Sequence, residues 1–182
     1  MDEIIFKGKS KKGKEIVIRY PEKADLQELL NFINELSQEK TFILYQGEVI
    51  NEEYEIKYLD SILKQIEEKT RVHLLVFCNN KLIGGAELSK DRLARKHVGI
   101  FHMAVLKDFR SEGIGKILMS QVLEEGLKVI SGLKIISISV FADNPIARKL
   151  YESFGFVECG KLPKGVKHGN EFIDEILLYK GV

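Results

Sequence analysis

Apolar and polar residues follow one another in segments whose period changes several times along the chain. Residues 15–20 alternate as a half-buried strand does, and Pro21 ends that segment. From Asp25 the apolar residues recur every three or four positions, which predicts an amphipathic helix. Asn51 can cap a second helix, in which an apolar stripe begins at Tyr54. We therefore expect one strand followed by two helices that pack on a sheet.

Two apolar runs in the middle of the chain predict an antiparallel hairpin. They cover residues 71–78 and 81–89 and are joined by Asn79-Asn80, and asparagine tolerates the positive φ that a tight turn needs. A third run, residues 98–106, is almost continuously apolar, as in a central strand buried on both faces. These runs supply the middle of the expected sheet.

The rest of the chain alternates helices and strands. The expected elements are a helix from about residue 113 to 131, a strand at 135–141, a short helix at 145–153, and closing strands near 156–159 and 172–179. The glycine- and lysine-rich residues 160–169 are expected to form a loop between the two closing strands.

The junction between the third apolar run and the following helix carries the first candidate chemistry. It reads Arg110-Ser111-Glu112-Gly113-Ile114-Gly115, and its glycines let a ligand approach the backbone closely. Amides at a helix start lack partners and the helix dipole adds positive charge, so a phosphate is favoured there, and Arg110 and Lys116 strengthen the field. The spacing fits neither a Walker loop nor a dinucleotide fingerprint. The alternative is a tight turn that binds nothing.

Two motifs together resemble one known family. The pattern Arg-x-x-Gly-x-Gly after a strand resembles the acetyl-coenzyme A signature of the GNAT N-acetyltransferase superfamily, and residues 144–156 resemble its downstream motif, N-x-x-A-x-x-L-Y-x-x-x-G-F, at every named position. The order of the expected elements is also that of the GNAT fold. The resemblance implies an α+β fold with a mixed, mostly antiparallel, twisted sheet of about seven strands and four helices, splayed at the cofactor site.

The resemblance also implies an activity and a set of site residues. The protein would move an acetyl group from acetyl-coenzyme A to a primary amine by direct attack in a ternary complex, without a metal. The residues implied at the cofactor are Met103, Ala104, Val105, Arg110, Ser111, Glu112, Gly113, Ile114, Gly115, Lys116 and Asn144. Met103 and Val105 would lend main-chain groups, and Tyr151 would protonate the departing thiolate. Alternatively, Tyr151 packs against the sheet and Asn144 is a helix cap.

The general base is less clearly indicated. Some members of the family carry a glutamate where this chain has Gly99. Protein N-terminal acetyltransferases carry a pattern similar to Leu-Glu-Val-Arg where this chain has Ile138-Ser139-Val140-Phe141, so both usual carboxylates are absent. Glu87, His102 and a chain of water molecules remain as candidates, and Glu87 is taken as the catalytic base. The missing pattern favours a small-molecule amine as acceptor. A peptide or protein amine, or a non-catalytic acyl-coenzyme A-binding module, are the alternatives.

The acceptor side can also be outlined by resemblance. The first two helices and their connection border the acceptor groove in the family, which makes Phe42, Tyr45 and Tyr54 candidate contacts; each is equally explained as a packing residue. The sequence leaves the oligomeric state open, and a homodimer is possible.

Composition and charge indicate the number of domains and argue against several kinds of binding partner. The 182 residues suit one domain, placed at residues 15–182 after an N-terminal extension of residues 1–14. A net charge of +1 argues against nucleic-acid or membrane binding, and the basic residues 7–14 are expected to form a solvated loop. The first residues lack a secretory pattern, so the cytoplasm is expected. Cys78 and Cys159 are expected to be reduced core residues, and no Cys/His spacing suggests a metal.

Overall fold

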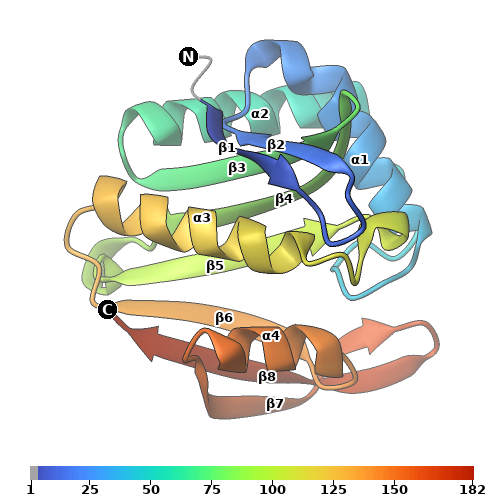
Figure 1. Ribbon diagram of the computed structural model, residues 1–182. Helices are drawn as coiled ribbons and strands as arrows, with labels where there is room; N and C mark the ends of the chain where they lie inside the picture. The colour runs from blue at the N-terminus through green and yellow to red at the C-terminus, as the bar shows by residue number, and fades with distance from the viewer. Residues whose placement is uncertain (1–3) are drawn as a thin grey trace.

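An open sheet of eight strands organises the computed structural model, which describes residues 4–182 (Figure 1). Its strands are β1 (Ile4–Lys9), β2 (Glu15–Arg19), β3 (Arg71–Cys78), β4 (Lys81–Lys90), β5 (Val98–Val105), β6 (Ile135–Phe141), β7 (Val157–His168) and β8 (Glu171–Gly181). The helices are α1 (Leu26–Gln38), α2 (Glu52–Glu67), α3 (Ile114–Val129) and α4 (Pro145–Ser153). Short 3₁₀ turns are η1 (Lys23–Asp25), η2 (Leu93–Arg95) and η3 (Lys107–Phe109).

The strands lie in the order β1-β2-β3-β4-β5-β6-β8-β7, and within residues 4–182 all neighbours are antiparallel except β5 and β6. The β5–β6 pairing is short. It runs from Val98 opposite Ile135 to Ile100 opposite Ser137, and beyond it the two strands diverge (Figure 1). Meanwhile β4 stays paired with β5 as far as Val105. The carboxyl-terminal half of β5 therefore has a ladder partner on one edge and an open gap on the other.

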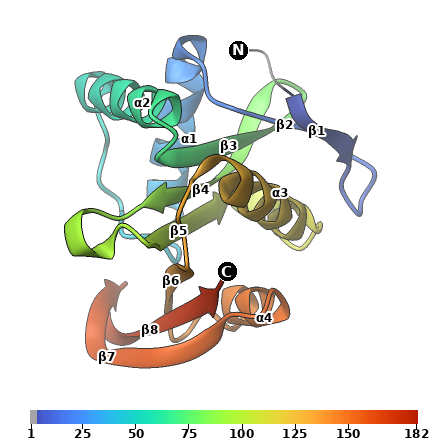
Figure 2. The ribbon, with the colours of Figure 1, turned by 90° about the vertical axis from the view of Figure 1, so that its left-hand side faces the viewer.

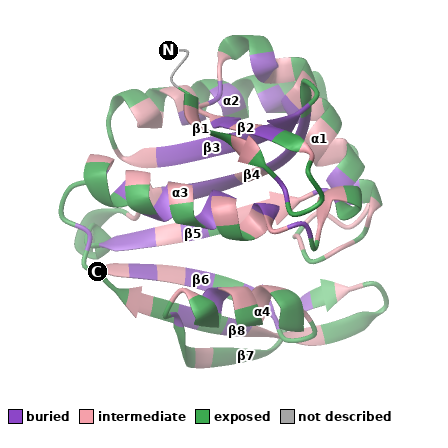
Figure 3. Ribbon diagram, in the orientation of Figure 1, coloured by how far each residue is buried: buried purple, intermediate pink, exposed green. Residues whose placement is uncertain are grey.

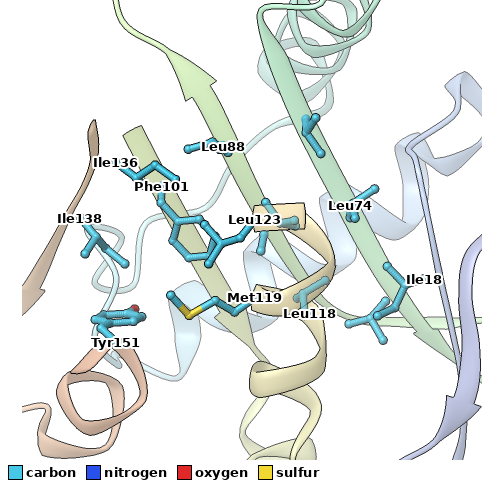
Figure 4. Packing of buried hydrophobic residues seen from close by; sticks show 14 of the residues in the cluster. Ile18, Leu74, Leu88, Phe101, Leu118, Met119, Leu123, Ile136, Ile138 and Tyr151 are labelled. Atoms are coloured by element: carbon cyan, nitrogen blue, oxygen red, sulfur yellow. The ribbon is translucent and has the colours of Figure 1, made fainter. Parts of the chain in front are cut away.

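Helices cover both faces of the sheet. In Figure 2, α3 and α4 lie on one side and α1 and α2 on the other. The larger core forms beneath α3, where Leu118 and Met119 meet Leu74 of β3 and Phe101 of β5 (Figure 4). A smaller cluster forms on the opposite face, between Leu59 of α2 and neighbouring residues of α1, β3 and β4. Buried residues concentrate in β3 to β5, whereas β7 and β8 are largely exposed (Figure 3).

Most expected elements are confirmed. The α+β architecture with a mixed, mostly antiparallel sheet and four helices is present, and so is the hairpin at Asn79 and Asn80, both with positive φ. The side chain of Asn51 caps α2 by accepting the Tyr54 amide at 2.8 Å. The helix expected after the glycine turn is α3. Local periodicity and cap chemistry thus specify these elements correctly.

Three expectations were wrong. Part of the expected extension, residues 4–9, is strand β1, which pairs with β2 and sends Phe6 against the main core, so the sheet has eight strands. The expected loop at residues 160–169 lies mostly within β7, which pairs with β8 as far as its last residue, His168. Cys159 is exposed on that edge strand, whereas Cys78 is buried as expected, and both thiols are free. All three lie on the edge strands β1 and β7: lysines on an edge strand read like a loop, and a side chain such as Cys159 can stay exposed there.

Candidate functional site

The turn before α3 presents a run of unpaired backbone donors. Ser111 and Gly113 both have positive φ, +62° and +81°, and this places two kinks in the chain just ahead of the helix. The amides of residues 111–115 donate to no partner in the described part of the chain. The Lys116 amide, which the sequence placed in the same set, donates to the Gly113 carbonyl at 3.1 Å. The set of free amides therefore ends at Gly115, and it suits a phosphate. We call residues 111–115 the phosphate loop.

The side chain of Glu112 faces away from the solvent side of this loop. It is completely buried, and its carboxylate accepts hydrogen bonds from the Ser10 hydroxyl and the Lys14 ammonium, each at 2.8 Å. The hydrogen bond from Lys14 holds the pKa of Glu112 below its ordinary value. Lys11 adds a backbone bond, from its amide to the Glu112 carbonyl at 2.8 Å. The turn between β1 and β2 is therefore fastened to the phosphate loop, and Glu112 can meet a ligand through its amide alone.

Arg110 also has a different role from the one expected of it. Its Nε donates to the Val105 carbonyl at 2.8 Å, and its guanidinium forms an ion pair with Glu39 and lies 3.4 Å from the Thr41 hydroxyl. In this structure the charge of Arg110 is paired with Glu39 and is not left free toward the phosphate loop. Arg110 instead ties the end of β5 to the segment after α1, which positions the phosphate loop indirectly.

Beside the phosphate loop, β5 has an open edge. Met103, Ala104 and Val105 pair with Ala86, Gly85 and Gly84 of β4, and all three lie beyond the last residue of β5 that pairs with β6. Within residues 4–182 their main-chain groups on the β6 side have no ladder partner, and apart from the Val105 carbonyl, which accepts Arg110 Nε, an extended polar ligand can pair with them. The structure thus brings these three predicted residues next to the loop, at the position where the strands splay.

The downstream motif supplies one buried phenol and one cap. Asn144 caps α4, since its Oδ1 accepts the Ala147 amide at 3.1 Å, which leaves its NH₂ group for a ligand. Tyr151 is 6% exposed, and in Figure 4 it reaches from α4 toward Ile138 and Met119. Its hydroxyl makes no hydrogen bond within residues 4–182, and burial raises its pKa to about 12. The phenol therefore stays protonated near neutral pH, as a proton donor must.

A groove opens where β5 and β6 separate. It has a volume of about 470 Å³, and the residues that line it include Ile100, His102, Ser137, Ser139, Leu162 and Leu177. His102 is exposed and alternates with Phe101 and Met103, which pack into the core beneath α3. Because successive side chains of a strand point to opposite faces, His102 faces the side of the sheet that carries α1 and α2. Tyr151 and His102 therefore approach the splay from opposite faces.

Glu87 lies in a buried charge cluster rather than in this groove. Its carboxylate is 2.7 Å from the Arg71 guanidinium and 3.2 Å from Nδ1 of His73, the latter without hydrogen-bond alignment. Burial by itself would raise the pKa of Glu87, but His73 and then Arg71 outweigh it and lower the pKa to about 2. Such a carboxylate holds a proton weakly and is already paired with the Arg71 guanidinium beside the His73 ring, so the geometry does not favour Glu87 as the general base.

Aromatic residues join the segment between α1 and α2 to the last hairpin. His168, at the tip of the β7–β8 hairpin, contacts Asp143 at 2.9 Å through Nδ1, and its ring lies tilted against that of Phe42 with centroids 4.8 Å apart. The predicted acceptor contacts Tyr45 and Tyr54 lie with their hydroxyls 3.4 Å apart. The segment between α1 and α2 thus reaches across to the last hairpin, and packing explains at least Phe42.

Comparison with known proteins decides the family. The sequence matches the model of the acetyltransferase (GNAT) family over residues 29–156. The chain belongs to this family. It is an N-acetyltransferase by that membership, and its acetyl donor is acetyl-coenzyme A. Among the described residues, no group of three or more His, Cys, Asp or Glu side chains is arranged to hold a metal ion. No helix in residues 4–182 is long and apolar enough to cross a membrane.

Solved structures agree with the GNAT fold. A GNAT acetyltransferase from Streptococcus pneumoniae superposes with a TM-score of 0.82 at 28% identity, covering 92% of this chain and 100% of that one. A ribosomal-protein-alanine N-acetyltransferase from Brucella melitensis gives 0.78 at 22% identity, over 91% and 99%. A putative acetyltransferase from Salmonella typhimurium, solved with its cofactor acetyl-CoA, gives 0.77 at 15% identity, over 91% and 93%. The chain spans essentially the full length of each.

Proposed function

We propose that this GNAT protein acetylates a primary amine of a small molecule, with both substrates bound together. The observation that carries the proposal is the position of the phosphate loop beside the open edge of β5, with the groove beyond that edge. A donor and an acceptor entering from opposite faces of the splay would meet at β5. Direct attack requires such a meeting, because no covalent enzyme intermediate is formed.

The donor side follows from unpaired backbone groups. The free amides of the phosphate loop would bind the pyrophosphate of acetyl-coenzyme A, and the main chain of Met103, Ala104 and Val105 would hold its pantetheine arm. The NH₂ group of Asn144 is available to the same arm. Acetyl-coenzyme A supplies the acetyl group as a thioester. The Met103 amide would polarise the thioester carbonyl, a kind of contact worth ~3 kcal/mol in other acyl transfers.

Two side chains on opposite faces of the sheet, at the point where β5 and β6 diverge, would carry out the proton transfers. His102, exposed in the groove, would accept the proton of the acceptor amine, because histidine is the side chain that most readily exchanges protons near neutral pH. Tyr151 would donate its hydroxyl proton to the departing sulfur. We assign the base role to His102 rather than to Glu87, whose carboxylate is already held by Arg71 and His73.

The groove and the residue at position 139 both favour a small acceptor. Ser139 lines the groove. It stands at the position of the glutamate in the Leu-Glu-Val-Arg pattern of protein N-terminal acetyltransferases, so the carboxylate of that pattern is missing here. A groove of about 470 Å³ suits a small molecule. A peptide amine is the second candidate, because the Brucella melitensis relative is described as a ribosomal-protein-alanine N-acetyltransferase.

A panel of amines tests the proposal. The protein is incubated with acetyl-coenzyme A and with amino acids, polyamines, aminoglycosides or peptides with free N-termini, and mass spectrometry records acetylated products. We expect turnover of at least one small amine, at a kcat/KM at least tenfold above that of any peptide. Turnover of peptides alone would contradict the small-molecule assignment. Release of coenzyme A without any acetylated product would contradict amine transfer itself.

A further inference from the structure

The charged residues near the N-terminus form a tight turn that lies on the phosphate loop. The turn between β1 and β2, residues 10–14, contributes the Ser10 hydroxyl and the Lys14 ammonium to the buried Glu112 carboxylate. Lys12 lies 3.4 Å from the same carboxylate. The sequence placed this segment outside the domain and assigned it no function.

The Lys11 side chain lies over Gly113 of the phosphate loop. A Cβ atom built on Gly113 would meet the Lys11 side chain along its length, at 3.1 Å from Cγ, 3.4 Å from Cδ and 3.2 Å from Cε. The aliphatic part of Lys11 therefore crosses directly over Gly113. Its amide is fixed too, by the 2.8 Å bond to the Glu112 carbonyl. The ammonium group is one bond beyond Cε, so it too lies near Gly113 of the phosphate loop.

The local charges are unbalanced. Lys12 and Lys14 share the single carboxylate of Glu112, while the ammonium of Lys11 has no anionic partner within residues 4–182. The loop beneath contributes unpaired N–H donors and the start of α3, which add partial positive charge. A lysine held over such a backbone without a counter-ion is suited to an anion that the protein does not itself contain.

We propose that the turn at residues 10–14 is a wall of the donor site and that the Lys11 ammonium binds a phosphate group of coenzyme A. The inference rests on the proposed function, since it requires the donor's nucleotide to lie on the phosphate loop. Glu112 acts as a positioning residue in this arrangement: it binds no ligand through its side chain but holds the turn in place. Gly113 is then favoured for a second reason besides its positive φ, because a Cβ atom there would lie tight against the Lys11 side chain and force it to shift.

Binding measured by calorimetry tests the proposal with three ligands. Acetyl-coenzyme A carries a pyrophosphate and a 3′-phosphate, 3′-dephospho-coenzyme A lacks the latter, and S-acetyl-pantetheine lacks both. Lys11→Met keeps the aliphatic packing over Gly113 and removes only the charge. Lys7→Met is the matched control, because it removes the same charge from an exposed position on β1. Thermal melting of both variants checks that the fold is kept.

We expect Lys11→Met to raise the Kd of acetyl-coenzyme A about 5- to 10-fold at low salt, as for loss of one charge-assisted contact in solvent. Lys7→Met should leave it within twofold, and Lys11→Arg should restore most of the affinity. Loss of the effect with 3′-dephospho-coenzyme A assigns Lys11 to the 3′-phosphate, and a persistent effect assigns it to the pyrophosphate. Equal Kd values for wild type and Lys11→Met, or weaker binding of S-acetyl-pantetheine as well, would overturn the inference. Wild-type protein that binds none of the three ligands would instead contradict the proposed function.

Discussion

The ammonium of Lys14 lies 2.8 Å from the carboxylate of Glu112, 98 positions further along the chain. The contact joins the first hairpin to the phosphate loop, and the Glu112 side chain is completely buried in it. A buried carboxylate needs such partners, because an unpaired charge away from water is strongly unfavourable. The phosphate loop is therefore positioned in part by residues at the start of the chain.

Replacing Glu112 by glutamine should loosen this junction. The variant keeps the shape but removes the charge that Lys14 and Lys12 face. Since the folded-state pKa of Glu112 is lowered, its contribution to stability is present above its ordinary pKa and is lost as the pH falls through the lowered value. We expect the variant to unfold at a lower urea concentration than wild type at pH 7. The difference between the two midpoint concentrations should shrink below about pH 4. Glu124→Gln, which removes an exposed helix pair with Lys128, is the control. A difference that does not depend on pH would contradict this account.

The cluster of Glu87, Arg71 and His73 makes a prediction about stability. The pKa of Glu87 falls from 4.5 to about 2 on folding, so its stabilisation is present above about pH 4.5 and is lost as the pH falls towards 2. A shift of that size corresponds to a contribution on the order of 3 kcal/mol at neutral pH. Glu87→Gln should therefore lower the free energy of unfolding at pH 7 by an amount of that order, and flatten its decline in acid. Urea unfolding from pH 7 to pH 3 measures both.

The two candidate general bases, Glu87 and His102, lie on the neighbouring strands β4 and β5. His102 lies directly opposite Glu87 in the β4–β5 register, but His102 alone is exposed in the groove. We expect His102→Gln to lower kcat/KM by ~10²-fold or more and to remove the acidic limb of the pH profile, where a general base is lost to protonation. Glu87→Gln should leave the shape of that profile unchanged. The reverse pattern would return the base role to Glu87, and an unchanged profile in both variants would favour a water route.

Tyr151→Phe tests the proton donor. The substitution deletes the hydroxyl and keeps the ring that packs 6.4 Å from Phe156, so the fold should survive. General acid catalysis is worth ~10²–10⁴-fold, and a loss of that order in kcat is expected where chemistry limits the rate. The Kd of acetyl-coenzyme A should change little, because the proton is needed only as the thiolate leaves. Full kcat under the same conditions would make Tyr151 a packing residue.

The sequence predicts those features that depend on local patterns. The helix stripes, the cap at Asn51 and the glycine turn before α3 are encoded within a few residues of themselves, so periodicity and turn chemistry reveal them. Strand β1 and the long β7 are different, because each is held by an edge pairing and carries lysines that resemble a loop. Their partners can be known only after the sheet is assembled.

The same distinction applies to the site. The positions of the phosphate loop and of Tyr151 follow from motifs, whereas the partners of their side chains come from distant segments. Arg110 is occupied by Glu39, 71 residues earlier, and Glu112 by Ser10, 102 residues earlier. The charge of Glu87 is likewise neutralised across the β3–β4 pair. A spacing motif identifies the backbone geometry of a site, but it does not show which side chains remain free for the ligand.

Binding of acetyl-coenzyme A to two variants of Gly113 tests the central claim, that the phosphate loop holds the donor, most directly. Gly113→Ala introduces the strain of a side chain at φ +81° and the contact with Lys11. Gly113→Asp adds to the same changes a negative charge where the pyrophosphate is proposed to lie. Calorimetry should therefore show weaker binding by Gly113→Asp than by Gly113→Ala, by about tenfold or more, with similar melting temperatures. Equal affinities of the two variants, both unchanged from wild type, would place the donor elsewhere and contradict the account.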